Sequence, residues 1–470
     1  MKFTASAAAF LMLGACTLAP RYEREAPPVA QSWPVQTPTS NAQLQSGSSS
    51  EAVAQLKWRS LFVDPALQKT IDLALSNNRD LRIAALDIER ARAQYRISRA
   101  DLLPSLDGGV SGSRSHTGSA NTTTGLATTS ESYSANVSAG WELDLFGRIR
   151  SLNKAALESF FATRETRNAV GISLISEVAT AWLNVAADQD SLRLTQATYA
   201  ARKDAYDIAA GRARFGSLSD LDLAQAKTDM ETSRAAVASA QTSLDQDKAA
   251  LTLLVGATVP DDLLPQGLKA GQVADSLPVG LPSDVLLARP DVLAAEHDLK
   301  AANADIGAAR AAFFPTISLT GSSGSASHDL DGLFKSGTGN YSYGVNVRVP
   351  IFAGGANAAG LKGAKTSRDI ALAQYEHSIQ QAFSEVSQAL AVRARIDERL
   401  DAQTQATDAA RTAMKLSQAR YDNGTDSYLT LLTTQRTLYA SEQSLIDLQT
   451  LRATNLVALY RALGNDDSLK

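Results

Sequence analysis

Residues 341–351 read YSYGVNVRVPI, and residues 133–143 read YSANVSAGWEL. In both segments large or apolar side chains alternate with small or polar ones, which is the period-two pattern of a β-strand with two different faces. Each segment has 11 residues, and a transmembrane β-strand needs about 9–11. Tyrosine at the start of each run and Trp141 near the end of the first are typical of the aromatic girdles of a membrane barrel. The two segments therefore predict membrane-spanning strands.

Two weaker alternating segments begin after Pro104 and Pro315, and we expect them to pair with these strands. Residues 111–132 and 322–340 are rich in Gly, Ser and Thr and are predicted to be long outer loops. A half-buried soluble sheet would show the same alternation. If the strands lie in lipid, however, an open sheet edge is not tolerated, so a four-stranded piece has to close with copies of itself. Membrane barrels have at least about eight strands, which requires two copies or more.

Two very long helices are predicted on either side of the second strand pair. Residues 151–214 and 356–421 contain no proline. At ~1.5 Å per residue, helices of this length span roughly 96 and 99 Å and need partners along their sides. Shorter helices are predicted before the strands and after the turns, at residues 67–102, 284–312, 220–254 and 427–463. A plain coiled-coil stalk would explain these helices, but it would not explain the strands between them.

The second half of the chain restates the first at a shift of roughly 206–211 residues. The segment LLPSL at 102–106 corresponds to FFPTI at 313–317, and RFG at 214–216 corresponds to RYDNG at 420–424. The order in each half is helix, strand, loop, strand, long helix, turn and helix, which is the mark of an internal repeat. We therefore expect one structural repeat over residues 51–256 and another over 284–464. A linker over 257–283 joins them, and a tail over 465–470 follows.

Residues 1–16 read MKFTASAAAFLMLGAC. A positive end, a short apolar core and small residues predict a secretory signal peptide over residues 1–15. The ending LGAC resembles the bacterial lipoprotein signal, in which the cysteine is lipidated and becomes the mature N-terminus; an ordinary signal peptide that happens to contain a cysteine is the alternative. Cys16 is the only cysteine and Thr17 follows it, so the usual inner-membrane retention aspartate is missing. We expect a lipid anchor at Cys16 and an extended tether over 16–50.

Composition excludes several other functions. The formal net charge is -4, so no basic excess indicates a nucleic-acid partner. No phosphate loop or nucleophile elbow is present. We therefore expect no enzyme activity, no catalytic residue and no cofactor. The histidines lack the spacing of a metal site; they are His116, His297, His328 and His377.

Several ordered motifs resemble the outer-membrane efflux protein family, the TolC-like channels, and in particular its lipoprotein branch. The most specific run from LLARPDV at 286–292, through AANADIGAAR at 301–310, to FPTISL at 314–319. The segments WELDLFG at 141–147 and VPIFAGG at 349–355 are also family-like, as is RYDNG at 420–424 followed by YLTLL at 428–432. The resemblance covers residues 58–464, which is nearly all of the mature chain.

The resemblance implies a mostly α-helical homotrimer in the outer membrane. Its four strands per chain would form a 12-stranded β-barrel, continued by an α-helical barrel across the periplasm. A collar would use residues 52–65, 257–282 and the C-terminal residues. The implied function is passive conduction of small molecules and drugs in a multidrug efflux pump, together with a periplasmic adaptor, an inner-membrane RND-type transporter and outer-membrane lipid. The same channel serving type I protein secretion, and a lipid-anchored structural coiled coil, remain alternatives.

The resemblance also places a resting gate at the two tight turns, 215–219 and 422–425. By position Asp426 resembles the ring aspartate of the lipoprotein branch, Asp220 follows the equivalent turn of the first repeat, and Tyr421 matches a gate tyrosine. Thr430 and Thr433 stand where TolC itself carries aspartates, so a double aspartate ring is not expected. Asp220 and Asp426 also suit helix N-caps, which is the commonest role for an acid just after a turn.

Overall fold

The computed structural model describes residues 17–34, 57–123, 125–274, 283–464 and 466. These residues form two compact units. The strand unit comprises residues up to 25, 87–164 and 294–375, and the hairpin unit comprises residues 26–86, 165–293 and 376 onward. Cys16, the predicted lipidation site, lies outside the described residues. The helices and strands in chain order are α4 (Trp58–Leu61), α5 (Pro65–Asn77), α6 (Arg79–Ala100), β1 (Ser105–Thr117), β2 (Thr128–Leu143), α7 (Arg148–Arg214), α8 (Asp220–Val255), α9 (Pro290–Ala311), β3 (Thr316–Ser327), β4 (Gly339–Arg348), α10 (Ala356–Asp422) and α11 (Tyr428–Leu463).

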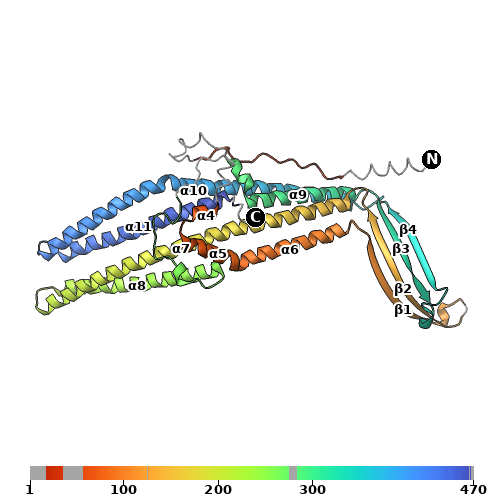
Figure 1. The fold of residues 1–470 in the computed structure, drawn as a ribbon, viewed down its shortest axis with the longest axis horizontal. Helices are drawn as coiled ribbons and strands as arrows, with labels where there is room; N and C mark the ends of the chain where they lie inside the picture. Colours follow the sequence, from red (N-terminus) through yellow and green to blue (C-terminus); the bar gives the residue numbers. More distant parts are fainter. Residues whose placement is uncertain (1–16, 35–56, 124, 275–282, 465, 467–470) are drawn as a thin grey trace. The chain divides into compact units, whose positions relative to one another are not determined.

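The predicted repeat is visible in the lengths of the helices. α6 and α9 each have 22 residues, α7 and α10 each have 67, and α8 and α11 each have 36. In each half a 22-residue helix precedes two strands, and the 67- and 36-residue helices follow as a hairpin (Figure 1). The mostly α-helical fold with an internal repeat is therefore confirmed.

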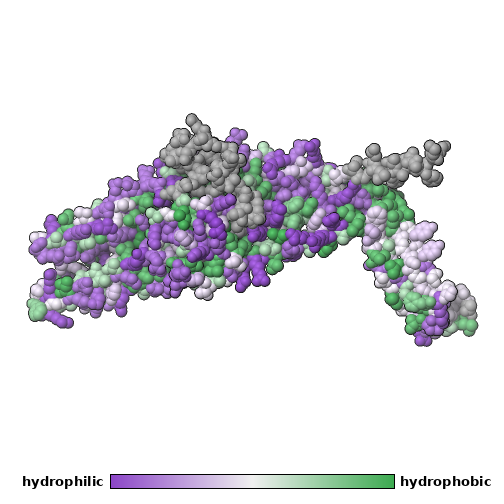
Figure 2. All heavy atoms as spheres, in the orientation of Figure 1, coloured by the Kyte–Doolittle hydropathy of each residue, from purple (hydrophilic) through white to green (hydrophobic). Residues whose placement is uncertain are grey.

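The four strands form a single antiparallel sheet in the order β1-β2-β3-β4. Its register lines up the alternating side chains so that one face collects the large apolar residues, while Ser, Thr, Asn and Gly dominate the other. Figure 2 shows mainly pale and green residues on this sheet, in contrast to the many purple residues of the helices. The apolar face includes Leu106, Val110, Val137, Trp141, Leu319, Tyr343, Val345 and Val347.

Several predicted boundaries of strands and helices are wrong. β4 ends at Arg348 rather than residue 351, because Pro350 has no N–H to give to a ladder. β1 continues to Thr117 and β2 begins at Thr128, so much of the predicted outer loop is strand. The single helix expected over 67–102 breaks at Asn78, whose side chain accepts a hydrogen bond from the N–H of Leu81 at 2.8 Å and so caps α6.

The core of the hairpin unit surrounds the middle of α7. One stretch of α7 is long and apolar enough to cross a membrane, but 67 % of it is buried inside the protein. Its Trp182 is 1 % exposed, and the indole N–H donates to the carbonyl of Leu263 at 2.8 Å. Packing against protein therefore accounts for most of this apolar stretch.

The motif LLARPDV makes a second set of long-range contacts within the hairpin unit. Arg289 is 6 % exposed, and its guanidinium donates to Asp291 at 2.7 Å and to Glu385 of α10 at 2.9 Å. It also donates to the carbonyl of Ala462 at the end of α11. A buried cation with several acceptors is a costly arrangement to break, so this motif holds the start of α9 to the last helical pair.

The first described residues of the predicted tether pack on α9. Within the strand unit, Asn303 donates to the carbonyl of Pro20 at 2.8 Å, and Arg310 donates to the carbonyl of Leu18 at 2.8 Å. Gly307 lies between these positions, where an added Cβ would come within 2.8 Å of Ala19. We call residues 18–25 the N-terminal strap.

Glu296 is the main anchor of the N-terminal strap. Its side chain is 3 % exposed, and it accepts hydrogen bonds from Arg24 Nε at 3.0 Å and from the hydroxyl of Tyr22 at 3.0 Å. Lys300, one turn along α9, lies 3.1 Å away. Burial alone would raise the pKa of Glu296, but the hydrogen bonds from Arg24, Lys300 and Tyr22 outweigh it and hold the pKa below its ordinary value.

Candidate channel gate

The two helical hairpins of the hairpin unit turn in the same way and at the same end of that unit (Figure 1). Gly216 follows α7 with a φ of 70°, and Gly424 follows α10 with a φ of 72°. In each turn an N–H reaches back to a helix carbonyl, from Ser217 to Arg212 at 3.0 Å and from Thr425 to Arg420 at 2.9 Å. This is the left-handed glycine ending of a helix, and it sets the sharp return that the repeated RFG and RYDNG motifs predict.

The N-cap role predicted as an alternative for Asp220 and Asp426 is wrong. Ser219 caps α8 by accepting from the N–H of Asp222, and Ser427 caps α11 by accepting from the N–H of Thr430. Asp220 is the first residue of α8 and is exposed. There its charge still faces the positive end of the helix dipole.

Asp426 is held by an ion pair within its own turn. Arg420 Nε lies 2.9 Å from Asp426 Oδ2, and a second guanidinium nitrogen lies 3.0 Å from Oδ1. The Asp426 side chain is 18 % exposed and the Arg420 side chain 64 %. If three copies of Asp426 formed a ring, each would therefore be paired with its own Arg420. This pairing reduces the repulsion between the aspartates near the axis.

Tyr421 links the two hairpins. Its ring lies 5.8 Å from the ring of Tyr428 at the start of α11, and the guanidinium carbon of Arg212 on α7 lies 5.9 Å from its centroid. Burial raises the pKa of the Tyr428 hydroxyl, and the nearby charge of Asp229 adds to the rise. The structure therefore brings Tyr421 and Asp426 to neighbouring contacts around one turn and leaves Asp220 outside them.

Asp229, which the sequence analysis did not single out, forms a buried ionic contact between the hairpins. Its side chain is 4 % exposed, and Oδ1 lies 2.6 Å from a guanidinium nitrogen of Arg436 on α11 and 3.4 Å from one of Arg202 on α7. Arg202 is 11 % exposed. We call these three residues the Asp229 hub. The residues 229 and 436 are 207 apart, close to the repeat shift, so opposite charges at repeat-equivalent positions were the signal that could have revealed the hub.

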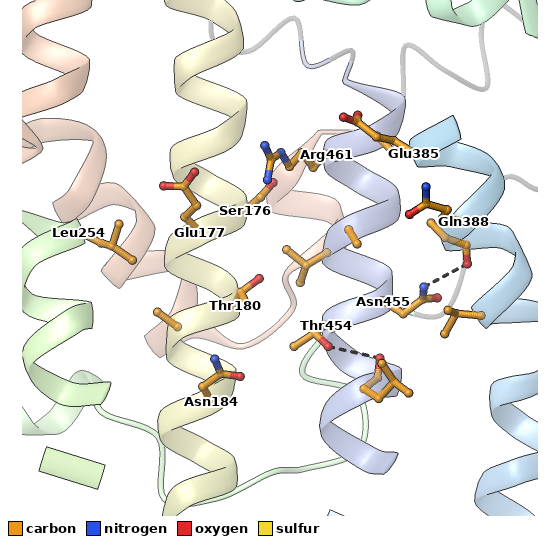
Figure 3. A pocket seen from close by; sticks show the side chains of 17 residues that line it. Ser176, Glu177, Thr180, Asn184, Leu254, Glu385, Gln388, Thr454, Asn455 and Arg461 are labelled. Carbon is orange, nitrogen blue, oxygen red and sulfur yellow. Dashed lines mark hydrogen bonds between the residues drawn. The ribbon is translucent and has the colours of Figure 1, made fainter. Parts of the chain in front are cut away.

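A groove of about 730 Å³ lies between α7, α10 and α11 of the hairpin unit. Figure 3 shows Ser176, Glu177 and Thr180 of α7 on one side, and Thr454 and Asn455 of α11 opposite them. The amide of Asn455 donates to the carbonyl of Ala389 on α10 at 3.0 Å. At the groove Asn455 therefore joins α11 to α10.

Comparisons with known proteins identify the family of this chain. The model of the outer membrane efflux protein family matches residues 70–257 and 281–465. The chain belongs to the outer membrane efflux protein family. It is 44 % identical over 456 residues to the solvent efflux pump outer membrane protein SrpC of Pseudomonas putida, covering 97 % of this chain and 96 % of that protein. It is 40 % identical to the outer membrane protein OprJ of Pseudomonas aeruginosa, with 97 % and 94 % covered.

Solved structures of the family share the fold. The open state of the Neisseria gonorrhoeae MtrE outer membrane channel superposes with a TM-score of 0.83 at 39 % identity, covering 96 % of this chain and 98 % of that one. As a family member, the chain is an outer-membrane efflux channel subunit that extends into the periplasm. This overturns the alternative of a purely structural coiled coil, and the family is one of transport proteins, not of enzymes.

Proposed function

We propose that three copies of the chain close their sheets into one barrel and continue it as a helical barrel through the periplasm. The sheet carries this proposal: in the described residues β1 and β4 pair on one side only. Each unpaired backbone group costs several kcal/mol in hydrocarbon, and three four-stranded sheets give 12 strands without an edge. The apolar face fits lipid and the polar face fits a water-filled lumen.

The proposed substrates are small lipophilic molecules. Relatives are named for pumps that export solvents, toluene and antibiotics, and their likeness to this chain supports the same class here. We assign a periplasmic adaptor and an inner-membrane RND-type transporter as partners. The transporter supplies the energy, and the channel conducts passively.

The proposed gate lies at the turns of the two hairpins. Tyr421 and Asp426 belong to it through the contacts around the second turn, and Asp220 is assigned to the exposed rim of the first. The Asp229 hub holds the second hairpin against the first when the gate is closed. Opening requires its contact with Arg436 to break or rearrange.

Lipidation of Cys16 is proposed as an accessory anchor to outer-membrane lipid. The N-terminal strap begins two residues later and is fixed on α9 by Glu296. A barrel that spans the membrane needs no lipid to remain there, so the anchor serves assembly and positioning.

Efflux by whole cells tests the proposal. Bacteria that lack their own efflux channel but contain an RND-type transporter and adaptor are loaded with a lipophilic fluorescent dye, with and without this chain. We expect lower dye accumulation when the chain is present, and no difference when the transporter is absent. Equal accumulation with and without the chain in the complete system would contradict the assigned function.

A further inference from the structure

The two free edges of the sheet carry opposite charges on the same face and at the same end. Asp107 lies on β1 opposite Ser138, and Arg348 lies on β4 opposite Thr316. Both side chains project from the polar face, because their strand neighbours there are serines and asparagines. Both residues are exposed, and in the part of the chain that the structure describes neither has a hydrogen bond or ion pair. We propose that Arg348 pairs with Asp107 of the partner subunit across each seam of the trimer, and that this pair sets the register in which the barrel closes.

The third charged residue on the polar face already has a partner within its own chain. Glu142 of β2 accepts two hydrogen bonds from Arg148, at 3.0 and 2.8 Å. Arg114 and Glu131, which form an ion pair, belong to the apolar face near the loops. Asp107 and Arg348 are therefore the complementary charges left for a seam between copies. This inference rests on the proposed trimer and adds its strand register.

The register of the seam follows from the register within one copy. A line across the sheet joins Ser105, Gly140, Thr320 and Gly344. β1 begins on this line at Ser105, whereas β4 extends four residues past Gly344, to Arg348. At the loop end β1 reaches 12 residues beyond the line, to Thr117, and β4 only five, to Gly339. Relative to this line, the strand ends therefore shift by four to seven residues over the three strand-to-strand steps within one copy. With the fourth step, from β4 to β1 of the partner subunit, the total shift becomes about 5–9 residues.

Barrel geometry selects one value from this range. The shift has to be even, since an odd value would place polar residues opposite apolar ones across the seam. With ~3.4 Å per residue and ~4.8 Å between strands, shifts of six and eight over four strands give tilts of about 47° and 55°. Barrel strands tilt by about 35–45°, which favours six. The line through Gly344 then meets Ser111 of the partner subunit, and Arg348 meets Asp107 of the partner subunit.

The same register matches the rest of the seam. Val345 faces Val110 of the partner subunit, and Tyr343 faces Gly112 of the partner subunit. Within one copy the ring of Tyr133 already crowds Gly112, where an added Cβ would lie 3.1 Å from the ring. Glycine here leaves room for a tyrosine on each side, which is a known way of packing aromatic rings on a sheet.

Disulfide formation between copies tests the register directly. Residues directly opposite each other on antiparallel strands have Cα atoms about 4.5–5.5 Å apart, within the range for a disulfide. Arg348→Cys is combined in three variants with Ser105→Cys, Asp107→Cys or Gly109→Cys. After mild oxidation we expect covalent trimer mainly from the Asp107→Cys pair, little from the other two, and none from Arg348→Cys alone. Stronger cross-linking through position 105 or 109 would overturn the register.

Charge reversal tests the ion pair without cysteines. We expect Asp107→Arg and Arg348→Asp each to lose the trimer that resists SDS, and the double exchange to restore it. Trimers that survive both single changes, or are not restored by the exchange, would overturn the pair. A native chain that forms no oligomer in membranes would instead refute the proposed trimer, and with it any seam.

Discussion

Replacing Asp229 with asparagine is expected to open the closed channel. The substitution removes the charge that holds Arg436 and leaves Arg202, which is 11 % exposed, without its counter-charge. The contact that joins the two hairpins is the one to Arg436, whose side chain is 60 % exposed. A hydrogen bond to a charged group contributes about 1.5–3 kcal/mol, so we expect the closed arrangement to lose about that much. We expect a higher mean single-channel conductance in planar bilayers.

Two matched variants show whether the effect belongs to the hub. Asp245→Asn removes an exposed acid of the same helix outside the proposed gate and is expected to leave conductance unchanged. Asp426→Ala breaks a pair whose arginine is 64 % exposed, so we expect a smaller rise, of the size of a surface pair at about 0–1 kcal/mol, together with weaker block by cations. A double-mutant cycle of Asp229→Asn with Arg436→Gln should show coupling between the two sites. Conductance that rises equally in Asp245→Asn would refute the assigned role of the hub.

Replacing Glu296 with alanine is expected to release the N-terminal strap. The carboxylate accepts from Arg24 and Tyr22 and contacts Lys300, so its loss removes most of the side-chain contacts of residues 22–24. Arg24 is 45 % exposed and returns to water easily, which limits the cost to about 2–3 kcal/mol. Trypsin cleavage after Arg24 in the folded protein should therefore become roughly 30- to 150-fold faster.

Asp101→Ala is the control for the strap, because it removes an exposed acid of the strand unit and leaves the residues around the cleaved bond unchanged; we expect its cleavage rate to match that of the native chain. The contact also predicts a pH dependence. Since the pKa of Glu296 in the folded protein lies below its ordinary value of 4.5, the contact stabilises the strap above that pH and is lost as the pH falls through the lowered pKa. Slow cleavage of Glu296→Ala at neutral pH would show that the strap is held elsewhere.

The sheet and the long helices could be predicted because their signals are local. Alternation over 133–143 fixes which side chains share a face, and the pairing then had to bring apolar residues together. The ends of elements were less predictable. Pro350 was visible in the sequence as a residue that cannot extend a strand, whereas the break at Asn78 depends on a hydrogen bond to the carbonyl of Leu254, which lies 176 residues away.

The two turns at which we propose the gate were predicted in place, but the contacts around them were not. The turns were marked by glycine and the repeat, and Tyr421 and Asp426 lie at the second turn as expected. The Asp229 hub was missed because its partner is 207 residues away, and nothing in the local sequence distinguishes Asp229 from a solvated acid on α8. Glu296 was missed for the same reason, since Arg24 lies 272 residues away. Burial is a property of packing, which local periodicity does not report for charged residues.

The central claim is that copies of this chain close a four-stranded sheet into a pore. Ion conductance of the purified protein, separated into oligomer and monomer by size before addition to a planar bilayer, tests it most directly. We expect discrete, stable conductance steps from the oligomer of three copies and none from the monomer, whose sheet has unpaired edges in the part of the chain that the structure describes. A trimer that gives no conductance, or a monomer that conducts ions, would contradict the account.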